Sequence, residues 1–134
     1  MPYEKIIFTN CREIEADHIL NLTGINDCFR ATYGAYFLGD CCKPEASCFE
    51  KLLDKLQCSA ENIVYFEDSV KNLKTAQSIG MQCVLIHSAT ACDEGVNITK
   101  VGEEHGLRRY SIEGFSSPVV VLDTLNDRGK QLME

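Results

Sequence analysis

Short apolar runs alternate with amphipathic segments along most of the chain, and this alternation constrains the fold more than any other feature. Residues 5–8, 63–66 and 82–86 are short, mostly apolar runs that end at polar residues, as buried strands do. Strands that are apolar on both faces are typical of a parallel sheet that helices cover on two sides. The sequence therefore predicts the α/β fold class, with a mostly parallel sheet between helical layers.

Three segments between or beside these runs carry helix signals. Residues 12–22 are followed by a capping Gly24, and a second helix is predicted to open at Pro44. A third begins at Val70 and stops at Gly80. The second helix has apolar residues at the i, i+3, i+4 and i+7 positions of one face, namely Phe49, Leu52, Leu53 and Leu56.

Further strands are predicted at residues 31–37 and 119–122. The second of these follows Pro118, which favours a strand at the sheet edge because proline cannot donate a ladder hydrogen bond. Residues 87–106 are rich in polar residues and glycines, so they predict a mobile loop or a degraded helix. Residues 123–133 predict a C-terminal tail or a short helix.

Composition excludes several classes of function and predicts one domain over residues 1–134. Twenty acidic residues against thirteen scattered basic ones give a net charge of -7, so a nucleic acid polymer is not an expected partner. The apolar runs are far shorter than the roughly 20 residues of a membrane span. Eight cysteines lack Cys-x-x-Cys spacing and no secretory signal precedes them, so we expect buried, inert thiols and a cytoplasmic location.

Polar residues that suit phosphate and metal chemistry follow the apolar runs or open a helix. Thr9 and Asn10 end the first run, and Lys43 supplies a positive charge just ahead of a helix, so all three suit an anion. Glu67 and Asp68 are adjacent carboxylates at the end of a buried strand, where Mg²⁺ would compensate their charge. Ligands of parallel α/β sheets bind at these strand ends. Together the residues describe a phosphate beside a divalent metal ion.

Each feature also has a purely structural interpretation. A Thr-Asn pair after a strand often forms a turn or a helix cap, and a Lys-Pro pair is commonly a solvated helix start. The acidic pair before Ser69 suits a helix N-terminus, where it complements the helix dipole. The order and spacing of the three groups nevertheless favour one shared ligand site over three unrelated features.

On these motifs the chain resembles the haloacid dehalogenase-like (HAD) phosphohydrolases, and more narrowly their pyrimidine 5′-nucleotidase-like branch, over about its first 90 residues. Residues 5–10 (KIIFTN) are similar to the family's second motif. Residues 42–44 (CKP), with Phe49 and Leu53, are similar to the third. Residues 66–72 (FEDSVKN) are similar to the fourth motif, which is the most specific of the three.

The resemblance implies a three-layer, Rossmann-like core and Mg²⁺-dependent hydrolysis of phosphomonoesters, nucleotides among them, through an aspartyl-phosphate. The implied partner is a small phosphorylated substrate or phosphate itself. Lys43 takes a catalytic role, because the family's lysine offsets charge on the nucleophile and the phosphate. The implied phosphate-binding residues are Thr9, Asn10 and Lys43, the implied metal ligands are Glu67 and Asp68, and Asn72 supports the metal loop.

The family's first motif, a strand ending in Asp-x-Asp-x-Thr that carries the nucleophile, is absent. No aspartate precedes Asp17, and the late strand that ends at Asp123 lacks a second aspartate at the required spacing. The helical cap of the family is missing too. We therefore expect an incomplete HAD core without its first, central strand, which is inactive by itself. The alternative is a non-catalytic HAD-like domain that binds phosphate or a protein partner.

Loss of a central strand would leave two buried sheet edges with unpaired backbone groups. We expect either that residues 5–8 pair directly with residues 63–66, or that a second copy of the chain covers them as a homodimer. In either arrangement we expect Thr9, Lys43 and Asp68 to meet at one end of the sheet.

Overall fold

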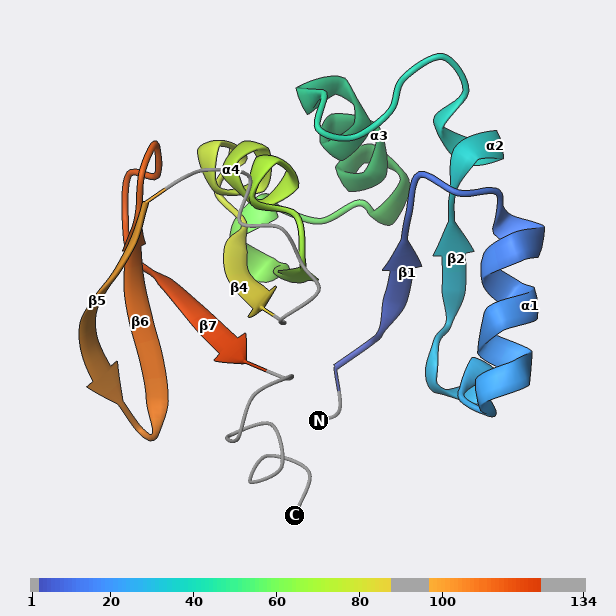
Figure 1. Cartoon of the computed structure of the whole chain (residues 1–134). Helices are drawn as coiled ribbons and strands as arrows, with labels where there is room; N and C mark the ends of the chain where they lie inside the picture. Colours follow the sequence, from blue (N-terminus) through green and yellow to red (C-terminus); the bar gives the residue numbers. More distant parts are fainter. Residues whose placement is uncertain (1–2, 88–96, 124–134) are drawn as a thin grey trace. The chain divides into compact units, whose positions relative to one another are not determined.

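The computed structural model describes residues 3–87 and 97–123, and the chain divides into two compact units, residues 1–57 and 58–134 (Figure 1). Together they form a mixed α/β protein with parallel and antiparallel strand pairs. No helix in the described part of the chain is long and apolar enough to cross a membrane. The tail or helix predicted beyond Asp123 lies outside the described residues.

The first unit begins with a β-α-β arrangement. Strand β1 (Ile6–Phe8) pairs in parallel with β2 (Ala31–Tyr33), and helix α1 (Glu13–Thr23) lies between them in the sequence. Helix α1 ends at Gly24, whose φ of 74° is a left-handed conformation that glycine adopts readily. The strand predicted at residues 5–8 and the helix that follows it are therefore confirmed.

Strand β2 is shorter than the strand predicted at residues 31–37, because a helical turn, α2 (Ala35–Leu38), replaces its second half. The change occurs at Gly34, where a Cβ atom would lie 2.4 Å from the carbonyl oxygen of Cys11. The carboxylate of Glu13 accepts hydrogen bonds from backbone N–H groups of α2. These contacts from distant parts of the sequence outweigh the local preference for an extended chain.

Helix α3 (Ala46–Leu56) begins two residues after Pro44 and confirms the predicted apolar face. Phe49 is fully buried, and Leu52 is almost so. The ring of Phe49 packs edge-on against that of Phe8 on β1, with the ring centroids 5.4 Å apart. The helix is thereby fixed against the strand that ends in the candidate phosphate-binding residues.

The second unit is a five-stranded sheet covered by helix α4 (Val70–Ile79). Gly80 ends α4 in a left-handed conformation, as predicted. The strand order across the sheet is β3 (Val64–Glu67), β4 (Gln82–His87), β7 (Val119–Asp123), β6 (Leu107–Ile112) and β5 (Ile98–Glu104). Strands β3, β4 and β7 run parallel, whereas β6 is antiparallel to both of its neighbours. The sheet is therefore mixed rather than mostly parallel.

Strands β5 and β6 form a hairpin where a loop or degraded helix was predicted over residues 87–106 (Figure 1). His105 and Gly106 turn the chain, with φ angles of 54° and 78°, as a type I′ turn requires. Strand β5 is charged and largely exposed, so it lacks the apolar alternation by which a strand is recognised. Residues 88–96 of the predicted loop lie outside the described residues.

The position of β7 corrects the prediction of an edge strand at residues 119–122. It lies inside the sheet, between β4 and β6. Pro118 precedes the ladder and so removes none of its hydrogen bonds. The β5–β6 hairpin, which the sequence did not predict, pairs with the side of β7 that faces away from β4. A strand at residues 119–122 was therefore expected at the sheet edge.

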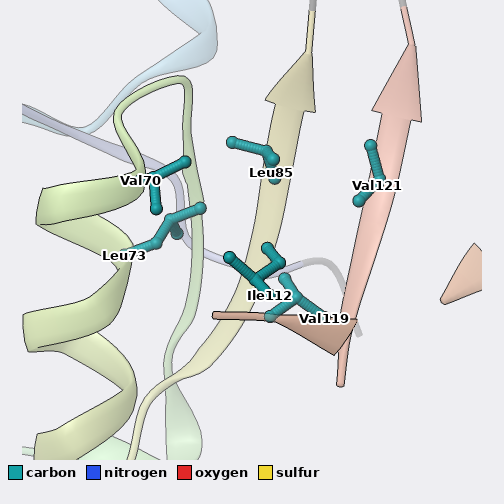
Figure 2. Close-up of a cluster of buried hydrophobic side chains, with 6 residues drawn as sticks. All are labelled: Val70, Leu73, Leu85, Ile112, Val119 and Val121. Atoms are coloured by element: carbon teal, nitrogen blue, oxygen red, sulfur yellow. The ribbon is translucent and has the colours of Figure 1, made fainter. Parts of the chain in front are cut away.

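The core of the second unit lies between α4 and the sheet (Figure 2). Helix α4 contributes two of its residues, and strands β4, β6 and β7 contribute the others. The six buried residues are Val70, Leu73, Leu85, Ile112, Val119 and Val121.

Strand β3 is exposed on one face, which corrects the prediction that residues 63–66 are buried on both. Val64 is 47% exposed and Phe66 57%. Strand β1 pairs with β2 in the first unit and β3 pairs with β4 in the second, and the expected pairing of residues 5–8 with residues 63–66 stays a prediction. The homodimer stays a prediction.

Candidate functional site

Lys43 is a buried charged residue, with only 8% of its surface exposed. Its Nζ donates a hydrogen bond to the carbonyl oxygen of Phe8 at 2.9 Å and lies 4.9 Å from the centre of the Phe8 ring. Both contacts suit a cation removed from water. The interpretation of Lys43 as a solvated helix start is therefore wrong, and its charge lies at the end of β1.

The side chain of Asn10 fixes the backbone of Lys43. The Lys43 N–H donates to Oδ1 of Asn10 at 2.9 Å, and Nδ2 of Asn10 donates to the Lys43 carbonyl at 3.2 Å. The structure thus brings these two predicted phosphate-binding residues together. It also gives the Asn10 side chain a positioning task that the sequence did not reveal.

Thr9 forms the turn between β1 and α1. Its Oγ1 accepts a hydrogen bond from the Cys11 N–H at 3.2 Å, and its hydroxyl lies 3.2 Å from the Cys11 sulfur. Its own N–H donates to the carbonyl of Tyr33 on β2 at 3.0 Å. The turn interpretation of Thr9 is therefore confirmed. Thr9 directly follows Phe8, whose carbonyl oxygen accepts the hydrogen bond from the Lys43 ammonium. The role of Thr9 in binding phosphate stays a prediction.

Glu67 is the centre of a hydrogen-bond cluster at the end of β3. Its Oε1 accepts from the hydroxyl of Tyr65 at 2.5 Å and from Nδ2 of Asn72 at 3.1 Å. Its Oε2 accepts from the backbone N–H of Asp68 at 3.1 Å. Glu67 therefore joins the strand to the helix that follows it.

Tyr65 was missed by the sequence analysis. It lies two residues before Glu67 on β3, and residues two apart on a strand share a face, so this spacing was the available signal. Burial raises the pKa of the Tyr65 hydroxyl well above its usual range, and the neighbouring Glu67 carboxylate adds to the shift. The hydroxyl therefore keeps its proton and donates a hydrogen bond to Glu67.

Asp68 and Ser69 form the junction between β3 and α4. Asp68 is exposed, and Ser69 is the N-cap of α4, with its Oγ accepting from the Asn72 N–H at 3.5 Å. The helix-cap interpretation of this segment is thus confirmed for Ser69. The side chain of Asn72 donates a hydrogen bond to Glu67, and its support of a metal loop stays a prediction.

Binding of Mg²⁺ by the acidic pair, Glu67 and Asp68, stays a prediction. Among residues 3–87 and 97–123, no group of three or more His, Cys, Asp or Glu side chains is placed to hold a metal ion. Magnesium sites that handle phosphate commonly use one or two protein carboxylates and complete the shell with water and phosphate oxygens. Both oxygens of Glu67 accept hydrogen bonds from the protein, and each still has room for a further contact or a metal ion only as far as its remaining lone pairs allow.

The predicted site residues thus form two groups, one in each unit. Thr9, Asn10 and Lys43 come together at the end of β1, and Glu67, Asp68 and Asn72 come together at the start of α4. The meeting of the two groups at one phosphate stays a prediction.

The thiols are less uniformly buried than expected. Cys48 is fully buried, and burial, together with a hydrogen bond to Cys41, raises the pKa of its thiol to about 12. Burial raises the pKa of Cys83 to about 11. The seven cysteines of the described residues form no disulfide, but three are exposed and correct the prediction: Cys28, Cys42 and Cys58.

Comparison with known protein families places this geometry in context. The chain matches the haloacid dehalogenase-like hydrolase family over residues 3–80. That segment is more than half of the chain, runs from β1 to the end of α4, and holds both groups of candidate residues. The motifs around Lys43 and Asp68, and the family match that spans them, lead to one conclusion: this chain belongs to the haloacid dehalogenase-like hydrolases.

Proposed function

We propose that this chain carries phosphate- and metal-binding residues of a Mg²⁺-dependent phosphomonoester hydrolase. The observation that supports this most is the buried Lys43 ammonium, held at the carboxyl end of a parallel strand. Ligands of α/β sheets bind at that end, and a fixed ammonium is a suitable partner for a phosphate oxygen. Membership of the hydrolase family supports the same reaction class.

Each residue has a separate task in this proposal. Lys43 binds a phosphate oxygen and lowers the cost of bringing an anionic nucleophile to an anionic phosphate. The Thr9 hydroxyl adds a hydrogen bond to the same group, and Asn10 holds the Lys43 backbone in place. Asp68 holds Mg²⁺, which when bound supplies positive charge for the phosphoryl oxygens.

The proposed substrates are small phosphomonoesters, with nucleoside 5′-monophosphates the first class to test. The narrower resemblance of the chain to the nucleotidase-like branch of the family motivates this choice. A second copy of the chain remains the proposed protein partner.

A non-catalytic phosphate-binding domain is the second candidate function. It is favoured by one observation, the lack of any Asp-x-Asp sequence in the 134 residues. In the family that motif supplies the nucleophile, without which an aspartyl-phosphate cannot form. The two candidates share phosphate binding at Lys43 and differ in turnover.

Phosphate binding is tested by titrating the ¹⁵N-labelled chain with inorganic phosphate in the presence of Mg²⁺. We expect amide shifts at residues 9–11 and 43, and their loss in Lys43→Met. Lys51→Met is a matched control, because the Lys51 ammonium likewise donates to a carbonyl, that of Leu38, and lies 5.2 Å from the Phe37 ring. Equal phosphate binding by Lys43→Met and the wild-type chain would contradict the proposal.

Turnover separates the two candidates. With p-nitrophenyl phosphate and Mg²⁺ we expect the chain alone to release no nitrophenol above background, because the nucleophile is missing. Hydrolysis that persists through purification and disappears in Asp68→Asn would show that the nucleophile lies within these residues.

A further inference from the structure

We propose that strand β3 is a dimerisation surface, on which β3 of a second copy of the chain adds in the antiparallel direction. The choice of a second copy as partner rests on the proposed function, and the surface that binds it is new. The paired strands join the five-stranded sheets of the two copies into one continuous sheet around a two-fold axis.

Strand β3 lies at an edge of its sheet and exposes apolar side chains there. Among the described strands it pairs only with β4. Val64 and Phe66 lie two residues apart, so they share one face of the sheet, and each is about half exposed. An exposed apolar edge strand is a place where a strand from another chain adds.

Helix α4 covers the inner strands of the opposite face. Its buried residues Val70 and Leu73 pack with Leu85 of β4 and with the strands beyond it (Figure 2). Tyr65 is the β3 residue that packs against this cluster. Because successive side chains of a strand alternate between faces, the neighbours of Tyr65 on β3 lie on the face away from α4.

The backbone groups of Val64 and Phe66 point to the outer side of β3. The N–H of Gln82 on β4 donates to the carbonyl of Ile63 at 3.0 Å, which fixes the direction of the ladder. Backbone groups of successive residues in a strand point to opposite sides. Those of Tyr65 therefore point to β4, whereas those of Val64 and Phe66 point away from it and suit a further strand.

Strand β5 forms the opposite edge of the same sheet and carries features that discourage pairing. Its register against β6 shifts between Lys100 and Gly102, and it is charged and largely exposed. Bulges and charged side chains are common means by which proteins keep edge strands from adding a partner. Strand β3 instead pairs with β4 in continuous register and is mostly apolar. Its edge is therefore the one suited to a partner strand.

An antiparallel pair of β3 strands centred on Tyr65 is self-complementary. It places each Val64 opposite the partner's Phe66, so the exposed apolar side chains cover each other. The same two residues exchange both backbone hydrogen bonds, because their groups are the outward ones. A register centred on Phe66 instead places Val64 opposite the partner's Asp68, a charged residue. The apolar match therefore favours a second copy in the register centred on Tyr65.

The association state of the whole chain is tested first, by sedimentation at tens of micromolar. We expect a dimer in the wild-type protein. Phe66→Lys places a charge on the paired edge and should raise the dimer dissociation constant at least about tenfold. Val101→Lys is the matched control, because Val101 is exposed to a similar extent on β5 and its replacement should leave the dimer unchanged. A wild-type monomer, or a dimer that Phe66→Lys leaves intact, would overturn the inference.

A second variant separates backbone pairing from apolar contact. Val64→Pro removes an outward N–H and keeps an apolar side chain, and proline is tolerated on a strand edge where the N–H faces outward. We expect this variant to weaken the dimer as well. A near-ultraviolet circular dichroism spectrum checks that each variant keeps its fold. A folded Val64→Pro variant that dimerises as tightly as the wild-type chain would show that β3 does not pair through its backbone, which also overturns the inference.

Amide hydrogen exchange identifies the strand that covers β3. We expect the Val64 amide to be protected in the wild-type dimer and to exchange faster on dilution and in Phe66→Lys. If β1 of the same chain pairs with β3, the Val64 amide will stay protected in a monomer at every concentration. That result would overturn the inference in favour of closure within one chain.

The dimer and the proposed function fail in different ways. Lys43 belongs to the first unit and β3 to the second, so Val64→Pro should keep the phosphate-induced shifts at residues 9–11 and 43. A dimer that binds no phosphate contradicts the proposed function and leaves the β3 interface in place. A monomer that binds phosphate at Lys43 contradicts the interface alone.

Discussion

Asn10 and Lys43 hold each other through two reciprocal hydrogen bonds, although 33 positions separate them in the sequence. The side chain of Asn10 satisfies both the N–H and the carbonyl of Lys43. The loop before α3 is thereby fixed against the end of β1, and the Lys43 ammonium reaches the Phe8 carbonyl.

Replacement of Asn10 should destabilise the loop and weaken phosphate binding together. Asn10→Ala leaves a partly buried donor and acceptor of Lys43 unpaired, so we expect the free energy of unfolding to fall by about 1–3 kcal/mol. Asn10→Asp keeps the acceptor for the Lys43 N–H, so this variant should be more stable than Asn10→Ala. It should still bind phosphate weakly, because the added negative charge repels the anion. Urea unfolding and phosphate titration measure the two effects, with the surface variant Asn21→Ala as control. Wild-type values for Asn10→Ala would contradict this account.

Gly34 should not tolerate a side chain. A Cβ atom there would lie 2.4 Å from the Cys11 carbonyl oxygen, so the backbone of Gly34→Ala must shift. We expect a loss of about 1–3 kcal/mol in the free energy of unfolding. Gly102→Ala is the matched control, because a Cβ atom at Gly102 has no neighbour within 4 Å and should change stability by less than about 0.5 kcal/mol. Equal effects of the two substitutions would show that the close approach is not required.

The ionised Glu13 side chain should stabilise the first unit, and this contribution should be lost in acid. Burial alone would raise the pKa of Glu13, but hydrogen bonds from backbone N–H groups, those of Phe37 and Tyr36 at 3.0 Å among them, lower it overall. A lowered pKa contributes stability that is present above the ordinary glutamate pKa of about 4.3 and is lost as the pH falls below it.

The comparison of wild type with Glu13→Gln measures this contribution. The free energy of unfolding should fall more steeply between pH 5 and pH 3 in the wild-type protein than in Glu13→Gln. At pH 7 the wild-type protein should be the more stable of the two, because a neutral amide accepts these hydrogen bonds less strongly. Parallel pH profiles would refute the assignment.

The thiols should react at very different rates. The pKa of Cys48 is raised from 9.0 to about 12, so at pH 8 its thiolate fraction is about a thousandfold lower than that of an unshifted thiol. Iodoacetamide at pH 8 should therefore label the exposed Cys28, Cys42 and Cys58 first and leave Cys48 unmodified until the protein is unfolded in urea. Mass spectrometry of tryptic peptides gives the order of labelling. Early labelling of Cys48 in the native protein would contradict its burial.

Local sequence signals predicted the elements that carry the site, and non-local contacts explain the errors. Strands β1, β3 and β4 and helices α1, α3 and α4 follow from apolar runs, periodicity and glycine caps. The early end of β2 depends on the contact of Gly34 with Cys11, which no local pattern reports. The place of β7 depends on a hairpin whose exposed strand β5 has no apolar alternation.

The site shows the same division. The motifs identified Lys43, Glu67 and Asp68, because charge at a strand end or a helix start is visible in the sequence. They did not reveal the burial of Lys43 or the bonds that Glu67 makes with Tyr65, since both arise from packing between elements.

The most direct test of the account is the dissociation constant of inorganic phosphate with and without Mg²⁺, measured by calorimetry on the wild-type chain. If Lys43 and Asp68 act on one phosphate, the two ligands are linked, and Mg²⁺ should tighten phosphate binding at least about fivefold. The effect should vanish in Asp68→Asn, which should keep the weak binding that Lys43 provides. Identical phosphate affinity with and without Mg²⁺ in the wild-type chain would contradict the claim that the two groups serve one site.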